Sequence, residues 1–338
     1  MSVAIKLDVI HMTQQRYHYF PNLQTFLLQN SASISRIITT FTLIMKRLYT
    51  TVAISLLFVV NALAGTPVVA PNLGTKTEVA PLWFGPNAFP VPEMTNGQID
   101  TACTIELAGD YFQGHLADGL DQTFDAFLRL HLPLWSERAA LTVWMPVVEF
   151  WRTDATVDAA RHILSDPAKD PGHDSGDVYI SLDIQLVTER FFRPAILLRS
   201  VLKTASGNNF GYARYYDAPG YFFDMTVGKS IGPLRLAATT GFLCWQTDNG
   251  RQNDAIQYGL AAFFTPGEIP YCAPWLRGLS LSAQFAGYVG WEHHGDSPQT
   301  LSARAAYRIA NFEPYLYFQQ GIKDWPFTQL RLGVVYRW

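Results

Sequence analysis

The last thirteen residues, 326–338, constrain the fold more than any other stretch of the chain. They read PFTQLRLGVVYRW, and every second residue from Trp338 back to Leu330 is apolar. The residues between them include Arg337, Arg331 and Gln329. A strand turns successive side chains to opposite faces, so this period of two predicts a strand with one apolar and one polar face. Such a strand fits a soluble sheet, and it also fits a membrane barrel whose apolar face meets lipid.

The segment that begins at Met45 has the pattern of a secretory signal peptide. It reads MKRLYTTVAISLLFVVNALAG, with two basic residues, a short apolar stretch and the small-residue site Ala62-Leu63-Ala64. The apolar stretch is too short for a membrane-spanning helix. We therefore predict that residues 45–64 are removed and that the exported chain begins at Gly65. Residues 1–44 have neither a period nor a targeting pattern, so we interpret them as a mispredicted extension upstream of the true start.

The ending VVYRW resembles the C-terminal strand of Gram-negative outer-membrane β-barrel proteins, in which alternating apolar residues end on Phe or Trp. The resemblance implies an exported outer-membrane protein whose last strand closes a barrel against its first strand. It also implies two partners. One is the lipid of the outer membrane, and the other is the outer-membrane assembly machinery, which would recognise the strand that ends at Trp338.

The composition agrees with a membrane barrel. Aromatic residues make up 14% of the chain and charged residues only 16%, against about 25% charged residues in a soluble domain. Aromatic girdles at two membrane interfaces would account for both values. The formal net charge is -3 and no run of Lys or Arg occurs, so we predict no nucleic-acid partner. No motif indicates a cofactor or a metal.

From residue 103 onward the chain alternates between strands and turns, which predicts an all-β, closed antiparallel transmembrane barrel of about twelve strands over residues 103–338. Short and long connections alternate, as expected for periplasmic turns and extracellular loops. Residues 65–102 are rich in Pro, Gly and Asn and are predicted to form an irregular lead-in on the periplasmic side. The predicted strands are 104–114, 123–134, 139–151, 177–190, 193–204, 220–230, 234–247, 254–265, 278–292, 300–310, 312–322 and 326–338.

The polar face of these strands supplies the candidate lumen residues. Charged groups that faced lipid at mid-depth would cost a few kcal/mol each, so their restriction to one face favours a barrel with a charged interior. That interior could filter solutes as a channel wall, or its charges could pair across a narrow lumen and only stiffen the barrel. The lumen or binding candidates are Asp183, Arg199, Lys203, Tyr215, Tyr216, Asp224, Arg304, Arg308, Glu313 and Arg331.

Two of these candidates, Tyr215 and Tyr216, lie in an aromatic loop between residues 203 and 223. The loop combines rings, charges and glycines, so it could form a ligand platform or a constriction inside the barrel. The alternative is an interfacial aromatic belt with a turn.

The catalytic candidates are His173 and Ser175, whose His-x-Ser spacing resembles that of outer-membrane phospholipases. An acyl hydrolase needs a base near its nucleophile, an orienting partner and an oxyanion hole, and the sequence shows none of these. A simple turn explains the same residues.

Two further groups of residues are candidates, one for a metal site and one for a disulfide. His293 and His294 stand beside carboxylates, but adjacent histidines on an extended chain point apart, which favours a solvated loop over a metal site. Cys103 and Cys272 would lie at the same end of the barrel and could form a disulfide.

The sequence thus predicts a passive outer-membrane channel for small solutes with a charged lumen. The alternatives are an outer-membrane lipid hydrolase and a structural barrel without an open pore.

Overall fold

A computed structural model of the chain describes residue 82 and residues 84–135, 138–161, 171–207, 219–246, 252–290 and 296–338. The predicted extension and signal peptide lie outside the described residues. So do four residues singled out above, Tyr215, Tyr216, His293 and His294.

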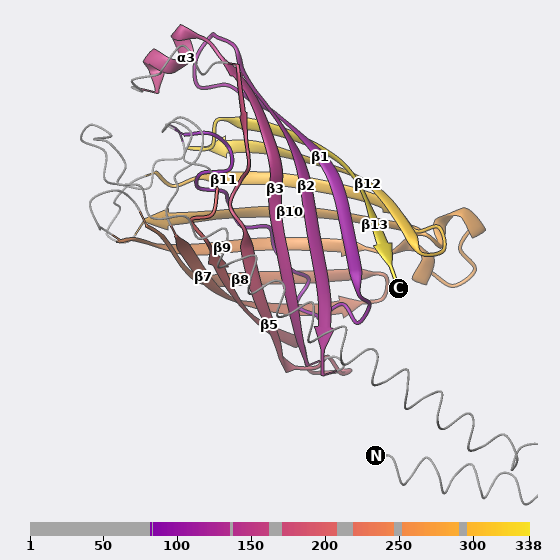
Figure 1. Cartoon of the computed structure of the whole chain (residues 1–338). Coiled ribbons are helices and arrows are strands. Elements are labelled where there is room, and N and C mark those ends of the chain that lie inside the picture. The colour runs from indigo at the N-terminus through magenta and orange to yellow at the C-terminus, as the bar shows by residue number, and fades with distance from the viewer. Residues whose placement is uncertain are drawn as a thin grey trace, which may run out of the picture. The chain divides into compact units, whose positions relative to one another are not determined.

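Twelve strands of 9 to 15 residues close into one antiparallel barrel (Figure 1), which confirms the predicted fold class. Most strand bounds differ from the predicted ones by only one to three residues. The strands are β1 (Thr104–Gly114), β2 (Asp121–Leu134), β3 (Ala139–Thr153), β5 (Tyr179–Val187), β6 (Ala195–Lys203), β7 (Gly220–Ile231), β8 (Leu234–Gln246), β9 (Gln252–Phe264), β10 (Leu279–Gly290), β11 (Gln299–Tyr307), β12 (Phe312–Lys323) and β13 (Phe327–Arg337).

The barrel is closed by its terminal strands. β1 pairs with β13 from Thr104 opposite Arg337 to Gly114 opposite Phe327, and it also pairs with β2. A thirteenth strand, β4 (Gly172–Asp174), pairs with the C-terminal part of β3, after the residues of β3 that pair with β5. Closure gives each long strand a neighbour on both sides, which is what backbone amides need in a bilayer without water.

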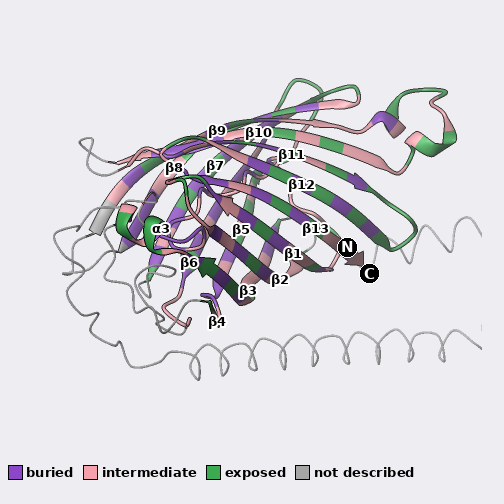
Figure 2. Cartoon of the chain, turned by 90° about the horizontal axis from the view of Figure 1, so that it is seen from above, coloured by how far each residue is buried: buried purple, intermediate pink, exposed green. Residues whose placement is uncertain are grey.

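The two faces of the wall differ in burial as the alternation predicts (Figure 2). On β13, Arg331 is 8% exposed and its neighbour Leu332 is 63% exposed. The same contrast separates Asp224 from Phe223 on β7. Polar side chains therefore face the lumen, whereas the exposed apolar side chains face outward, toward lipid.

We call the end of the barrel where β1 begins and β13 finishes the terminal end, and the opposite end the loop end. The short helix α3 (Ala155–Ala160) lies at the loop end (Figure 1). Its N-cap is Asp154, whose carboxylate also accepts the Leu120 N–H. The backbone hydrogen bonds from Leu120 and Val157 lower the pKa of Asp154 below its ordinary value. Two 3-10 turns, η4 (Pro266–Glu268) and η5 (Pro274–Leu276), stand at the terminal end.

Among the described residues, no helix is long and apolar enough to cross a membrane.

Residues 84–100, which we call the strap, run inside the barrel before β1 begins. Near the loop end, the Leu82 N–H donates to Asp296 Oδ2 at 3.2 Å. Farther along, the Met94 N–H donates to Gln284 of β10, and at the terminal end Asp100 pairs with Arg337. The described part of the predicted periplasmic lead-in is therefore irregular, but it crosses the lumen from the loop end to the terminal end.

Candidate functional site

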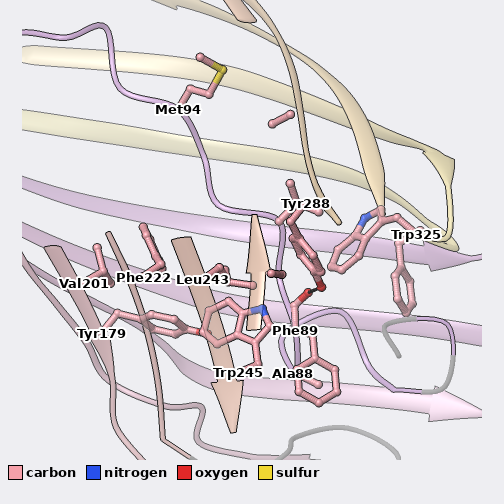
Figure 3. Packing of buried hydrophobic residues seen from close by; sticks show 14 of the residues in the cluster. Ala88, Phe89, Met94, Tyr179, Val201, Phe222, Leu243, Trp245, Tyr288 and Trp325 are labelled. Carbon is pink, nitrogen blue, oxygen red and sulfur yellow. Dashed lines mark hydrogen bonds between the residues drawn. The ribbon is translucent and has the colours of Figure 1, made fainter. Parts of the chain in front are cut away.

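Apolar side chains fix the loop-end half of the strap (Figure 3). Phe89 is 2% exposed, its ring meets Phe84 edge to face at 5.1 Å, and its carbonyl accepts the Tyr288 hydroxyl at 3.1 Å. Ala88, Val91 and Met94 are buried in the same cluster. The cluster joins the strap to lumen-facing residues of the wall, such as Trp245 and Phe222, so burial of apolar surface holds the strap in place.

Glu93, part-way along the strap, meets two arginines of the wall. Its Oε1 lies 2.8 Å from Arg331 Nη1, and its Oε2 lies 3.2 Å from Arg129 Nη2. We call Arg129 and Arg331 the arginine clamp. Each carboxylate oxygen of Glu93 thus accepts from a different guanidinium, which is a strong, charge-assisted arrangement.

The wall holds each arginine of the clamp with a carboxylate of its own. Glu106 stands opposite Arg129 in the β1–β2 register, and their charged atoms are 3.2 Å apart. Asp110 stands opposite Arg331 in the β1–β13 register, at 2.6 Å. The Phe127 ring lies 5.0 Å from the Arg129 guanidinium and 4.3 Å from that of Arg331. Strand register and one shared ring therefore position both guanidiniums.

A second ion pair supports the strap from the other side of the lumen. Arg199 of β6 donates to Asp224 of β7 through Nε at 2.8 Å and Nη2 at 2.5 Å. Its remaining Nη1 donates to the Glu93 carbonyl at 2.9 Å. Asp183, the neighbour of Arg199 in the β5–β6 register, instead accepts the Ser181 hydroxyl.

Toward the terminal end, three arginines lie around the Glu313 carboxylate. Arg304 lies 3.0 Å from it and also sits over the Tyr315 ring at 4.3 Å. Arg337 reaches Glu313 at 3.4 Å and also pairs with Asp100 of the strap. Arg308 is 4.0 Å away, and its side chain is 52% exposed at the rim. The structure therefore places Arg304 in the lumen and Arg308 at its edge.

At the loop end, Lys203 forms a buried pair with Asp177 at 2.5 Å. Close by in the sequence, Tyr179 stacks on Trp144 with a centroid distance of 5.2 Å and an interplanar angle of 10°. The Thr204 hydroxyl donates to the Val178 carbonyl, and the Ser206 hydroxyl accepts the Val178 N–H, which ties the start of the following loop to the residue before β5.

Two cavities of the lumen are lined in part by the strap. The larger, about 380 Å³, is lined by residues of both ends, from Trp325 near the loop end to Arg337 at the terminal end. The smaller, about 330 Å³, lies toward β9 and β10. Both cavities are lined by Glu93 and by the arginine clamp, so these three side chains lie where the two cavities adjoin.

The catalytic candidates lie at the outer face of the loop end. His173 on β4 is exposed, and its ring lies 5.7 Å from that of Phe150, an outward-facing residue of β3. The Ser175 N–H donates to Asp174 Oδ1 at 2.6 Å. Within the described residues no hydrogen bond joins His173 to Ser175, so their role in hydrolysis stays a prediction.

The disulfide considered above is not formed. Cys103, Cys244 and Cys272 are all thiols, and the Cys272 thiol donates to the Gly267 carbonyl at 3.6 Å. His293 and His294 are not described, but Asp296, one of the carboxylates beside them in the sequence, accepts the Leu82 N–H.

Sequence reasoning missed Glu93 and the strap. A segment rich in proline has no periodicity to read, and the partners of Glu93 are distant in sequence. One signal was present: Phe84, Phe89, Val91 and Met94 are too apolar for a segment left in water, which indicates that it packs against something.

No family model and no curated protein matches this chain. Solved structures do match. An outer membrane channel from Pseudomonas putida aligns with 74% of this chain and 100% of its own length, at 11% identity and a TM-score of 0.51. The NanC porin aligns with 69% of this chain and 100% of its own length, at 9% identity and a TM-score of 0.45. Outer membrane phospholipase A from Escherichia coli aligns with 71% of this chain and 93% of its own length, at 14% identity and a TM-score of 0.37.

At such low identity the likeness shows the fold alone. Three observations lead to one conclusion: the closed twelve-stranded barrel, its outward apolar face and the similar fold of the channel from Pseudomonas putida. The chain has the fold of an outer-membrane β-barrel protein.

Proposed function

We propose that this protein is a passive outer-membrane channel for small solutes, narrowed by its own strap. The observation that supports the proposal most is the cavity of about 380 Å³ beside the strap, because its lining includes residues of both ends of the barrel. Charged side chains of both signs line it, which suits a wall that selects solutes by charge. The channel structure from Pseudomonas putida has a similar fold.

The proposal includes an orientation and a route. The short turns, such as the one at Gly232 and Pro233 between β7 and β8, face the periplasm, and the loop end faces outward. The chain reaches the outer membrane through the signal peptide at 45–64, and the assembly machinery recognises the strand that ends at Trp338.

A second candidate function is a sealed structural barrel. It is favoured by the ion pairs of the lumen, because Arg199, Arg331 and Arg304 all have carboxylate partners within 3.0 Å. A lumen whose charges pair in this way can stiffen the barrel without passing solutes.

Single-channel conductance separates the two candidates. Refolded protein of residues 65–338 is compared in planar bilayers with Arg304→Gln, which changes a residue of both cavities. Arg193→Gln is the matched control, because Arg193 lies in an exposed turn between β5 and β6. We expect discrete current steps whose reversal potential shifts toward cation selectivity in Arg304→Gln only.

Silence from protein that keeps the heat-modifiable gel mobility of a folded barrel would reject the channel. The sealed barrel would then be the better interpretation. Equal ion selectivity in the wild type, Arg304→Gln and Arg193→Gln would show that the current does not pass Arg304.

A further inference from the structure

The arginine clamp is a carboxylate-binding site that the strap itself occupies. Glu93 places one oxygen on each guanidinium, at 2.8 Å from Arg331 and 3.2 Å from Arg129. Two arginines that converge on one carboxylate recognise the group by geometry as well as by charge. Any other carboxylate of similar reach would satisfy the same donors.

The clamp does not depend on the strap for its shape. Glu106 and Asp110 hold the two arginines through cross-strand pairs of the closed wall, and Phe127 lies beside both guanidiniums. The Tyr315 hydroxyl in turn donates to Glu106. Removing Glu93 would leave two positioned arginines with one donor direction each unfilled.

The carboxylate of Glu93 is also replaceable. Its side chain is 35% exposed and that of Arg129 is 27% exposed, so both are reached from the cavities. The strap belongs to no strand of the sheet, and the wall closes without it. Glu93 can therefore leave the clamp without opening a strand pair.

Rings stand beside the clamp. Trp144 lies 5.8 Å from the Arg129 guanidinium and stacks on Tyr179, and both line the larger cavity. A flat apolar group attached to a carboxylate would find stacking surface next to its anchoring charge. A cavity of about 380 Å³ is large enough for a molecule of that kind.

We propose that Arg129 and Arg331 bind aromatic carboxylates in competition with Glu93, which acts as a built-in competitor. The proposal rests on the proposed function, because the solute must enter the lumen. A carboxylate solute displaces Glu93 from the clamp, and Glu93 returns when the solute leaves. The apparent affinity is lowered by the fraction of time for which Glu93 fills the site.

The test is calorimetric titration of the refolded protein, residues 65–338 in detergent, with benzoate and with benzamide, its neutral analogue. The key variant is Glu93→Gln, which keeps the size of the side chain and removes its charge. The matched control is Asp100→Asn, which removes the other carboxylate by which the strap pairs with a wall arginine, Arg337. A double variant, Glu93→Gln with Arg129→Gln, removes one arginine of the clamp.

We expect Glu93→Gln to bind benzoate at least about tenfold more tightly than the wild type, the ratio that one charge-assisted hydrogen bond supports. Benzamide should bind none of the proteins measurably, Asp100→Asn should match the wild type, and the double variant should lose the gain. Heat-modifiable gel mobility confirms that each variant is folded.

Two outcomes would overturn the proposal. Equal benzoate affinity in Glu93→Gln and wild type would show that Glu93 does not compete. An equal gain in Asp100→Asn would assign the effect to a loosened strap. Because the titration needs no current, the two proposals can fail separately: benzoate binding with silent bilayers rejects the channel, and conductance without benzoate binding rejects the carboxylate site.

Discussion

Replacement of Phe89 by alanine should release the strap while the barrel stays closed. Phe89 is 2% exposed, packs edge to face on Phe84 and lies in the largest apolar cluster of the described residues. Truncation of a buried Phe to Ala costs about 3 to 5 kcal/mol. If about 3 kcal/mol of that cost falls on strap docking, the undocked fraction rises by about two orders of magnitude. The ladder from β1 to β13 should not change, because the strap takes no part in it.

Limited proteolysis with a glutamate-specific protease measures this release, because Glu93 is the one glutamate of the strap. When opening and closing are fast, the cleavage rate follows the population of the open form. Cleavage after Glu93 should therefore be about a hundredfold faster in Phe89→Ala. Leu332→Ala, which truncates an outward side chain that is 63% exposed, is the control and should match the wild type. Unchanged cleavage of a folded Phe89→Ala barrel would refute the assignment of Phe89 as the anchor.

Two further predictions concern the strap and the rim. The hydroxyl oxygens of Thr95 and Thr226 are 3.1 Å apart, so cysteines at both positions should form a disulfide when the native cysteines are replaced by serine. This disulfide should suppress cleavage at Glu93 until reductant is added. Equal cleavage with and without reductant would contradict the placement of the strap. At the terminal end, partial burial tends to raise the pKa of Glu189, but hydrogen bonds from Ser230, Arg235 and Lys229 outweigh it and lower the pKa to about 2. A lowered pKa stabilises the folded state above the ordinary value of 4.5, and this contribution is lost as the pH falls toward 2. The unfolding midpoints of the wild type and Glu189→Gln should therefore differ at pH 6 and converge near pH 2, whereas a constant difference would exclude this ionisation as the cause.

The wall of the barrel was predictable because a strand of a barrel obeys one simple rule. Lipid outside and a polar lumen inside impose a period of two on every strand, and that period is local in sequence. The predicted strand 104–114 coincides with β1, and 312–322 is one residue shorter than β12. The long connection after β3 was predicted as a loop, and it contains α3 and β4. Elements as short as these are set by their contacts with the rim, so they leave little periodic signal.

The candidate site was predictable only in part. The alternation placed Arg199, Asp224 and Arg331 in the lumen, where they are buried. It did not show which charges pair, because a side chain in the lumen can reach partners on several strands. It also did not predict that Glu93 lies in the lumen. The strap is irregular, and its contacts reach residues more than one hundred positions away, as in the pair of Glu93 with Arg331. Such contacts follow from the closed shape of the barrel and not from local sequence.

The ion pairs at the seam of the barrel have a consequence for its assembly. The last strand, β13, carries Arg331 and Arg337, and each pairs with a carboxylate of the strap, Glu93 and Asp100. The strap precedes β1 in the chain, so it is present before β13 arrives to complete the sheet. A sheet that closed with the strap outside would forfeit both of these pairs and leave each arginine with only its wall carboxylate, Asp110 or Glu313. Closing the barrel around the strap therefore adds two ion pairs at the seam between the first and last strands, which favours enclosure of the segment that leads into β1.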